Sequence, residues 1–315
     1  MRHRRRTPPS PLPQRDGIDA VRVRLPPDGA WATTRDHLIA RLSPAGMTKI
    51  DAMIEEGEIV DATGTPITAT TPYTPNTHVW FHRDMPTEPR VPFELRIVHQ
   101  DAHIVVADKP HFLATTPRGS HVTETALARL RRETGVETLS PAHRLDRLTA
   151  GLVLFVVRPE DRGRYQTLFR DRRVHKEYEA VARHTTEQPF PLTLRSRIEK
   201  ERGVLTAHEV QGGEPNAETS IAREQTRNTL ALYRLTPHTG RTHQLRVHMN
   251  SLGIPILGDP LYPRIAEATP PDDYRRPLQL LARTLEFRDP VTHRDRRFVS
   301  DRRLEAWESY ETWAQ

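Results

Sequence analysis

The chain contains no cysteine. Disulfide frameworks, thiolate nucleophiles and cysteine-based zinc sites are therefore excluded, and we expect no disulfide partner. A reducing cytoplasm is the simplest compartment for such a chain.

Long apolar runs are also missing. No stretch approaches the roughly 18 to 20 apolar residues that a membrane helix needs. The chain starts with MRHRRRTPPSPLPQR, which is basic and then proline-rich, with no apolar stretch behind it. We therefore expect no membrane association and a cytoplasmic location.

Lysine is scarce, and the basic charge comes almost entirely from arginine. Only four of the 47 basic residues are lysine, namely Lys49, Lys109, Lys176 and Lys200. The net charge of +6 favours a polyanionic partner such as nucleic acid. Heavy arginine use is equally what a GC-rich genome produces, so this signal leaves both interpretations open.

The 315 residues suffice for a large domain with a small one beside it. Residues 1–20 are rich in arginine and proline and predict a disordered basic tail. Residues 21–85 predict a small α/β unit, with helices at TTRDHLIARL and at MTKIDAMIEEGEIV, the latter ending near Gly57. Three prolines indicate a linker at residues 82–94.

The remainder, residues 86–315, is dense in strand patterns. Strands are predicted at about 102–110, 152–157, 178–183, 193–200, 217–225 and 229–236. Helices are predicted at TETALARLRRETG, with Gly135 as the C-cap, at EDRGRYQTLFRDRR and at 242–252. This pattern predicts an α+β domain built on a large, mixed, mostly antiparallel sheet flanked by helices.

The first chemistry-bearing stretch is PAHRLDRLTAGLVLF, residues 141–155. Its charged cluster contains Asp146 and runs through the small-residue turn 149–151 into an apolar strand. An acid at the mouth of a strand, flanked by arginines, would be held ionised in a cleft and suits a carboxylate nucleophile. A structural ion pair between aspartate and arginine explains these residues equally well.

The second stretch is TPHTGRTHQLRVHMNSLGIPILGDPLYP, residues 236–263. Thr242 or Thr239 can cap a helix that ends at Gly253, with Arg246 in its second turn. Its core-facing residues would be Leu245, Met249 and Leu252. Three histidines in this stretch, His238, His243 and His248, suggest a metal. The last two are five residues apart, about 140° around a helix, so they do not face one another as zinc ligands would.

The third stretch, VHKEYEAVA (174–182), places Tyr178 at the start of a strand. Such a tyrosine is commonly a core residue with its hydroxyl at the edge. Alone, this stretch indicates no function.

In this order and spacing, the three stretches resemble the RluA family of pseudouridine synthases over roughly residues 95–290. HRLDRLTAG resembles the family pattern HRLD-x-x-T-S-G, KEYEAVA its tyrosine motif, and TGRTHQLRVHMNSLGIPILGDPLY its third motif. Two positions depart from the family pattern: Ala150 replaces its usual serine, and Leu281 replaces a histidine. The small N-terminal unit is weakly similar to the alpha-L RNA-binding domain that often precedes this catalytic domain, although a generic helical appendage remains an alternative.

The resemblance implies a set of roles. Asp146 would be the catalytic aspartate, Arg246 would hold it ionised, and Tyr178 would stack on the flipped base. Arg144 would enter the RNA stack and help to extrude the uridine, which costs a few kcal/mol of unstacking. The substrate-binding set is completed by Arg241, His243 and Leu280.

The implied reaction isomerises uridine in ribosomal or transfer RNA without redox change or an outside group, so we expect no cofactor and no metal. The sequence contains no dinucleotide fingerprint or phosphate loop. We expect a monomer with structured RNA as its partner. Two rivals remain: a non-catalytic protein that binds or folds RNA, and a metal-dependent hydrolase using His143, Asp146, His175 and His243.

Overall fold

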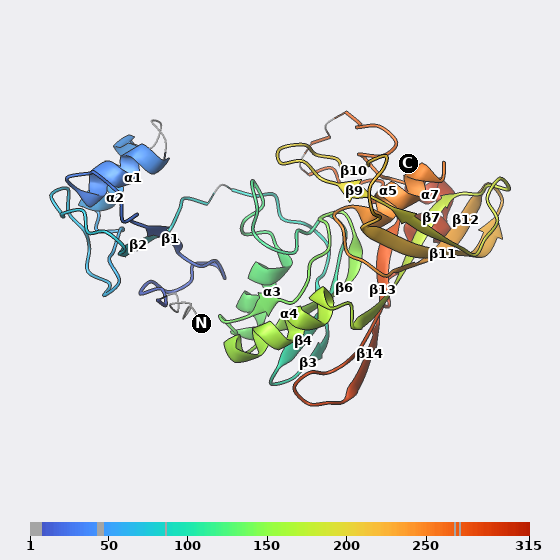
Figure 1. Cartoon of the computed structure of the whole chain (residues 1–315), viewed down its shortest axis with the longest axis horizontal. Coiled ribbons are helices and arrows are strands. Elements are labelled where there is room, and N and C mark those ends of the chain that lie inside the picture. The colour runs from blue at the N-terminus through green and yellow to red at the C-terminus, as the bar shows by residue number, and fades with distance from the viewer. Residues whose placement is uncertain (1–7, 43–46, 86, 268, 271) are drawn as a thin grey trace. The chain divides into compact units, whose positions relative to one another are not determined.

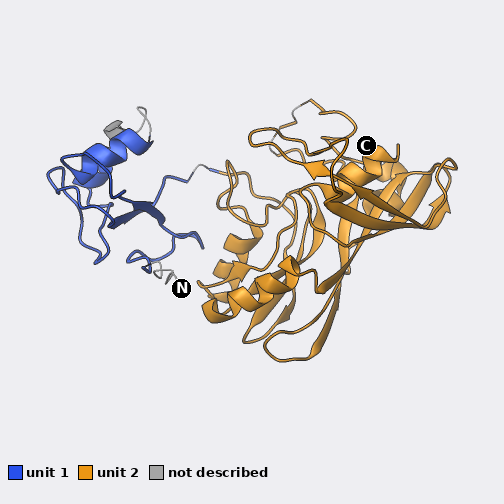
Figure 2. Cartoon of the chain, in the orientation of Figure 1, with its two compact units in different colours: residues 1–87 blue, residues 88–315 orange. Residues whose placement is uncertain are grey.

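The computed structural model describes residues 8–42, 47–85, 87–267, 269–270 and 272–315. The chain divides into two compact units, Met1–Thr87 and Glu88–Gln315, which are coloured separately in Figure 2. Residues 82–85 and 87–94, where prolines predict a linker, contain no helix or strand.

Unit 1 is a small α/β unit with its own core. Its elements are β1 (Val21–Arg24), α1 (Thr34–Leu42), α2 (Met47–Glu55) and β2 (His78–Phe81), and the two strands pair antiparallel. Leu38 of α1, Ile50 and Met53 of α2, and Val79 of β2 are buried together. Both predicted helices are confirmed, and Gly57 follows α2 with a φ of 70°.

The N-terminal segment is more ordered than its composition predicts. Residues 1–7 of the predicted tail lie outside the described residues. Further along, Arg15 and Ile18 exchange two backbone hydrogen bonds of 3.1 and 2.9 Å, and the Gln14 amide donates to Asp19 at 2.7 Å. Local turn bonds thus give part of the predicted disordered tail a defined path despite its few apolar groups.

Unit 2 is built on a large sheet, to which ten strands are assigned within the described residues. The path strands are β3 (Arg96–Gln100), β4 (Ile104–Lys109), β6 (Ala150–Val156), β13 (Leu280–Arg288), β7 (Val174–Arg183), β12 (Leu230–Pro237), β11 (Ala217–Arg227) and β8 (Leu192–Ser196). Off this path, β5 (Ser140–Pro141) pairs with β6 and β14 (Asp295–Val299) pairs with β13. A separate short pair joins β9 (Ile198–Glu199) to β10 (His208–Glu209).

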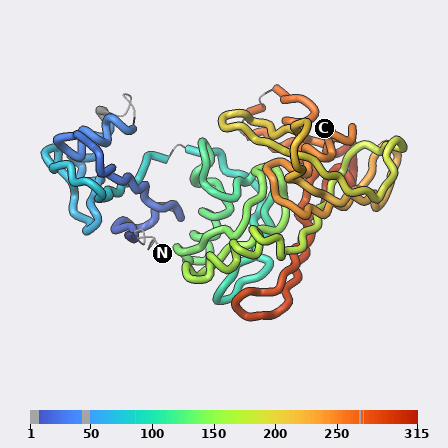
Figure 3. Tube along the Cα trace, viewed as in Figure 1, coloured from blue at the N-terminus to red at the C-terminus, as the bar shows by residue number. Residues whose placement is uncertain are grey.

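The sheet is mixed and mostly antiparallel, as predicted. Strand β13 is the exception, because it pairs parallel with β6 on one side and antiparallel with β7 on the other. Segments from the middle and the end of the chain therefore lie side by side at the centre of the sheet (Figures 1 and 3). This central position joins the Asp146 loop, which leads into β6, to the tyrosine strand β7.

The helices of unit 2 are α3 (Ala126–Thr134), α4 (Arg162–Arg170), α5 (Gln244–Ser251), α6 (Glu305–Glu308) and α7 (Tyr310–Ala314), with the 3₁₀ turn η2 (Pro159–Asp161) before α4. Helix α3 begins at the cap Thr125, whose side chain accepts a hydrogen bond from the amide of Ala128, and ends at Gly135 with a φ of 68°. Both α3 and the C-cap predicted for it are confirmed.

Both faces of the sheet are covered by helices. Alternate residues of a strand point to opposite faces. Accordingly, Val105 of β4 packs with α3, whereas its neighbours Ile104 and Val106 pack with α4. In the other half of the sheet, α5 packs on Ala180 and Ala182 of β7, while α6 and α7 pack on the opposite side. The sheet is therefore the middle layer of unit 2.

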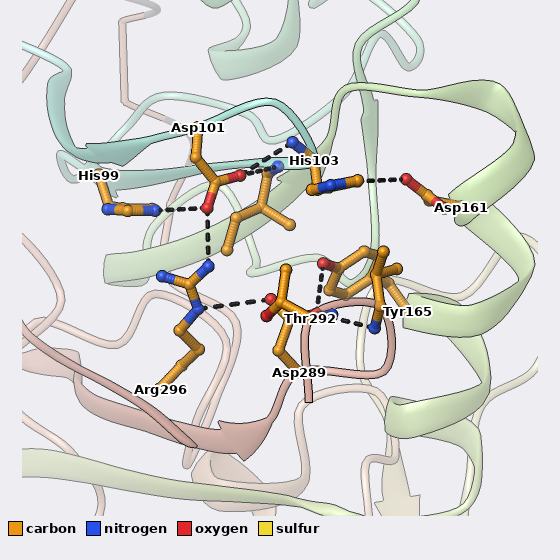
Figure 4. Close-up of polar contacts among 10 residues, drawn as sticks. His99, Asp101, His103, Asp161, Tyr165, Asp289, Thr292 and Arg296 are labelled. Atoms are coloured by element: carbon orange, nitrogen blue, oxygen red, sulfur yellow. Dashed lines mark hydrogen bonds and ion pairs between the residues drawn. The ribbon is translucent and has the colours of Figure 1, made fainter. Parts of the chain in front are cut away.

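A polar network joins two hairpins, β3–β4 and β13–β14, to helix α4 at one end of the sheet (Figure 4). Asp101, in the β3–β4 turn, accepts hydrogen bonds from His99 at 3.0 Å and from Arg296 of β14 at 2.8 Å. Asp289, after β13, accepts one from Tyr165 of α4 at 2.9 Å. Because these carboxylates are largely buried and fully partnered, the network fixes how the hairpins pack.

Candidate active site

One cavity of about 840 Å³ in unit 2 brings the predicted site residues together. It opens where the loop before β6 meets β7 and α5. All seven predicted residues contribute to its wall: Arg144, Asp146, Tyr178, Arg241, His243, Arg246 and Leu280. The fold thus gathers side chains that lie up to 136 positions apart in the printed sequence.

Asp146 lies on a tightly held loop between β5 and β6. Its backbone carbonyl accepts a hydrogen bond from the amide of Thr149 at 3.1 Å, which closes a turn. The buried neighbour Leu145 exchanges two hydrogen bonds with the hydroxyl of Thr115, at 2.8 and 3.2 Å. The Asp146 side chain keeps 37% of its surface exposed, so its carboxylate is open to a ligand in the cavity.

Arg246 of α5 connects Asp146 to a second, buried carboxylate. Its Nη1 lies 3.5 Å from Oδ2 of Asp146, and its Nε and Nη2 donate to Asp259 at 2.7 and 2.6 Å. Burial lowers the pKa of Arg246, but hydrogen bonding and the charges of Asp259 and Asp146 outweigh this and raise it. A permanent cation therefore faces Asp146.

The start of α5 differs from the prediction. The N-cap is His243, which has a left-handed backbone (φ 56°) and makes no side-chain cap bond, so Arg246 lies in the first turn. The predicted cap by Thr242 or Thr239 is wrong. The hydroxyl of Thr239 instead donates a hydrogen bond to Oε1 of Gln244 at 2.7 Å. The same Oε1 also accepts a hydrogen bond from the amide of Arg241 at 3.0 Å.

His243 reaches the cavity because of this unusual cap. Its Nε2 lies 3.8 Å from Asp146, and its Nδ1 is 3.0 Å from the hydroxyl of Tyr262. Burial lowers the pKa of His243, and the charge of Asp146 partly offsets this effect. His243 is thus a polar group, with only 11% of its side chain exposed, beside the carboxylate.

Tyr178 and Leu280 form the sheet wall of the cavity. Tyr178 of β7 pairs with Ala282 of β13, and Leu280 is buried at the start of β13. Burial and the charge of Asp146 raise the pKa of Tyr178, so its hydroxyl stays protonated. Arg144 and Arg241 are exposed at the cavity wall. These positions give a flat apolar surface beside the acid and cations at the opening.

Sequence reasoning gave no role to Lys109, a fully buried lysine beside this site. Its ammonium donates to the backbone carbonyls of Pro110, Leu113 and Arg147, at 3.0, 2.8 and 3.3 Å. Burial lowers its pKa to about 7, against the charge of Asp146, which raises it. A lysine inside the apolar run VVADKP was the available signal, since buried lysines need partners. Lys109 binds the backbone of the residue that follows Asp146.

Comparison with known proteins decides the family. A family model described as RNA pseudouridylate synthase matches residues 103–251. The dual-specificity RNA pseudouridine synthase RluA of Pasteurella multocida is 37% identical over 221 residues, which cover 65% of this chain and 92% of that protein. The chain belongs to the RluA-type family of RNA pseudouridine synthases. It is accordingly an isomerase with the pseudouridine synthase fold.

More distant relatives agree with this RluA-type assignment. Human pseudouridylate synthase RPUSD2 is 36% identical over 186 residues, which cover 57% of this chain and 33% of that protein. The solved structure of human RNA pseudouridylate synthase domain containing 1 matches with a TM-score of 0.54 at 23% identity, over 69% of this chain and 86% of that one. The latter likeness shows the fold.

The two departures from the RluA-type pattern are neighbours in space. Ala150 of β6 and Leu281 of β13 are register partners in the parallel pair, and both are fully buried in one apolar cluster. Alanine and leucine at these places leave no side-chain polar group that would need a partner in the core. The departures therefore change core packing behind the Asp146 loop.

The four residues of the metal-hydrolase rival do not converge. His143 stacks on Phe169 with ring centroids 4.3 Å apart, and its Nε2 accepts the amide of Leu154 at 3.1 Å. His175 is exposed next to Glu177. Among the residues that the structure describes, no group of three or more histidine, cysteine, aspartate or glutamate side chains could hold a metal ion. Within the same residues, no helix is both long and apolar enough to cross a membrane.

Proposed function

We propose that this RluA-type synthase converts specific uridines of ribosomal or transfer RNA to pseudouridine, with Asp146 as its catalytic aspartate. One observation carries the proposal: the partly exposed Asp146 carboxylate lies 3.5 Å from the buried guanidinium of Arg246 in the shared cavity. Opposite charges at this distance attract, so Arg246 holds the Asp146 carboxylate in the cavity, where it can act as a nucleophile.

The other cavity residues fit the needs of the reaction. The bond between uracil and ribose must break, the detached ring must turn over, and its carbon 5 must join the ribose. Asp146 would act on the ribose C1′ or on the uracil ring, or assist a glycal route. Tyr178 offers a ring on which the base can stack, and Leu280 closes the apolar side. A cavity of this size holds the free ring close to the ribose between the two bond changes.

The exposed arginines would bring the target nucleotide into the cavity. A uridine in structured RNA must leave its stack before an enzyme can reach it, and this costs a few kcal/mol. Arg144 would fill the place that the base vacates, because a guanidinium plane can stack on bases. Arg241 and His243 would contact the nucleotide near Asp146.

The test is carbodiimide-based mapping of pseudouridine in total RNA. Cells would carry the intact gene, a deletion, Asp146→Asn, or the matched control Asp272→Asn, which changes an exposed aspartate outside the cavity. We expect one or more sites to disappear in the deletion and in Asp146→Asn and to persist in the control. The lost sites would also name the RNA.

Binding of RNA without modification is a second candidate role for this isomerase, because arginines and lysines surround the cavity. If binding were its main role, no abundant RNA would lose a site in the deletion strain. If sites are lost in the deletion but retained in Asp146→Asn, Asp146 is not the catalytic aspartate. An RNA-binding role of unit 1, a monomeric state and a cytoplasmic location stay predictions of the sequence.

A further inference from the structure

A second cavity, of about 880 Å³, adjoins the active-site cavity. Its wall comes from the turn between α4 and β7, the end of β12 and the β13–β14 hairpin. Four residues line both cavities: Phe169, Arg172, Lys176 and Pro237. The two cavities therefore adjoin at these four residues, which form the junction.

Most basic residues of the second cavity already have acidic partners. Arg296 pairs with Asp101 and Asp289. Similarly, Arg297 pairs with Glu286, and Arg173 lies 3.6 Å from Asp171. These cations are neutralised within the protein itself.

The junction residues Arg172 and Lys176 differ, because neither forms an ion pair with any residue that the structure describes. Arg172 is exposed and Lys176 is half-buried. Burial lowers the pKa of Lys176, and the nearby charge of Arg172 lowers it further. Two cations that repel one another without a carboxylate between them form a place where an anion would be stabilised.

The backbone at Arg172 supports a role for its side chain. Arg172 donates its amide to Phe169 at 3.2 Å, and Arg173 donates to Leu168 at 2.9 Å, which is the helix-ending pattern that favours glycine at the position of Arg172. Arg172 instead adopts the left-handed conformation with a φ of 57°. A side chain at a glycine-favouring position is unfavourable for the fold, and an interaction outside the fold would explain it.

We propose that Arg172 and Lys176 bind a backbone phosphate of the RNA strand next to the target uridine, and that this strand continues into the second cavity. The inference rests on the proposed function, because it takes the uridine to occupy the cavity of Asp146. A strand fits better than a free phosphate ion, since the junction lies between two cavities of about 880 and 840 Å³. The arginine fork and the lysine ammonium are the usual donors to phosphate oxygens.

The test compares two arginines that share a backbone conformation. Arg172→Gly removes the junction cation, and Arg276→Gly is its control, because Arg276 is also exposed and left-handed (φ 51°) but lines neither cavity. RNA binding by the full-length protein is titrated at several salt concentrations. The probe is a transcript around the mapped uridine, or bulk transfer RNA where none has been mapped.

We expect Arg172→Gly to weaken binding about tenfold and to reduce the salt slope by about 0.7, the value for one lost single-strand phosphate contact. Its melting temperature should not fall, because glycine suits that backbone position. Lys176→Met should also reduce the slope. Equal affinities and slopes for Arg172→Gly and Arg276→Gly would overturn the proposal.

A chemically altered RNA separates a backbone phosphate from a free phosphate ion. One uncharged methylphosphonate linkage is placed at each position flanking the target uridine in turn. At one of these positions the uncharged linkage should weaken RNA binding by the wild-type protein but leave binding by Arg172→Gly unchanged, because the variant has already lost the contact to that phosphate. If every position affects both proteins alike, the site does not bind the backbone. The two proposals can fail separately. If Arg172→Gly reduces the salt slope of RNA binding but the wild-type protein makes no pseudouridine, the phosphate site is supported and the proposed function is contradicted.

Discussion

Arg246 donates two hydrogen bonds to Asp259, at 2.7 and 2.6 Å, while its remaining amino group lies 3.5 Å from Asp146. The side chain of Asp259 is only 1% exposed and that of Arg246 only 3%. The orientation of Arg246 is therefore set by the buried partner, and Asp146 meets a cation that is already in place. Such preorganisation removes the cost of arranging charges during the reaction.

Asp259→Asn should lower kcat at least tenfold with little change in RNA affinity, because Asp259 orients Arg246 and does not line the cavity. Loss of one member of a buried pair also destabilises a fold by about 3–5 kcal/mol. Single-turnover rates are therefore measured at a temperature at which the variant is folded by circular dichroism. A folded variant with the wild-type single-turnover rate would show that Asp259 is not required to orient Arg246.

The matched control for this variant is Asp273→Asn. Asp273 also accepts two hydrogen bonds from one guanidinium, that of Arg275, at 3.0 and 2.9 Å, and a third from the Arg275 amide at 3.1 Å, but this guanidinium is exposed to solvent. Exposed ion pairs contribute little. We expect neither kcat nor the melting temperature to change appreciably.

Tyr178 should act mainly through its ring. Replacing a stacking aromatic side chain costs about 1–3 kcal/mol per base, so Tyr178→Leu should have kcat/KM about 5- to 150-fold below that of Tyr178→Phe. The phenylalanine variant keeps the flat surface and loses only the hydroxyl. Both are measured by tritium release from 5-tritiated uridine in the substrate RNA. Equal impairment of the two variants would assign the role to the hydroxyl.

Local sequence signals predicted the parts of the fold that they control. Gly135, the predicted C-cap, ends α3, and the apolar run after Asp146 forms β6. The three motifs, read as a set, predicted which side chains would share a cavity. Their order and spacing were sufficient for six of the seven predicted wall residues, which lie within the motifs, whereas Leu280 lies outside them.

The remaining features depend on contacts between distant segments. Strand β13 (Leu280–Arg288) is central to the sheet, yet its LLARTLEFR sequence is rich in good helix formers and has no clear alternation. Pairing with β6 and β7 decides its conformation. Asp259 likewise lies within a quoted motif, but only the folded chain brings it to Arg246. Local sequence patterns therefore predict neither the strand conformation of β13 nor the contact between Asp259 and Arg246.

Asp101 should make the stability of unit 2 depend on pH. Burial raises its pKa, but hydrogen bonds from His99 and from the amides of His103 and Ile104 outweigh this and lower it to about 2, from 3.8. Because the folded-state pKa is depressed, the stabilisation is complete well above pH 3.8 and disappears as the pH falls to about 2. The shift corresponds to about 2 kcal/mol.

Asp101→Asn should therefore lower the free energy of unfolding by about 2 kcal/mol at pH 7 and by about half as much at pH 3. Urea titrations of both proteins across this range measure the difference. Asp295→Asn is the control, since Asp295 is 86% exposed and lies 3.9 Å from its arginine. A difference that is constant from pH 7 to pH 3 would mean that the Asp101 charge does not contribute.

Gly151 should be indispensable for the position of the Asp146 loop. It is the register partner of Ala282 in the parallel pairing of β6 with β13, its φ is 110°, and an added Cβ would lie 2.3 Å from the backbone oxygen of Ala282. Gly151→Ala must therefore separate the two strands, which we expect to cost about 3 kcal/mol and to lower kcat by moving Asp146 away from Arg246.

Gly163→Ala in α4 is the matched control, because an added Cβ there meets no described atom within 4 Å, and alanine should stabilise the helix by about 0.5–1 kcal/mol. Urea unfolding and single-turnover rates of both variants measure the contrast, and a Gly151→Ala protein as stable and active as Gly163→Ala would show that the parallel pairing does not position the loop.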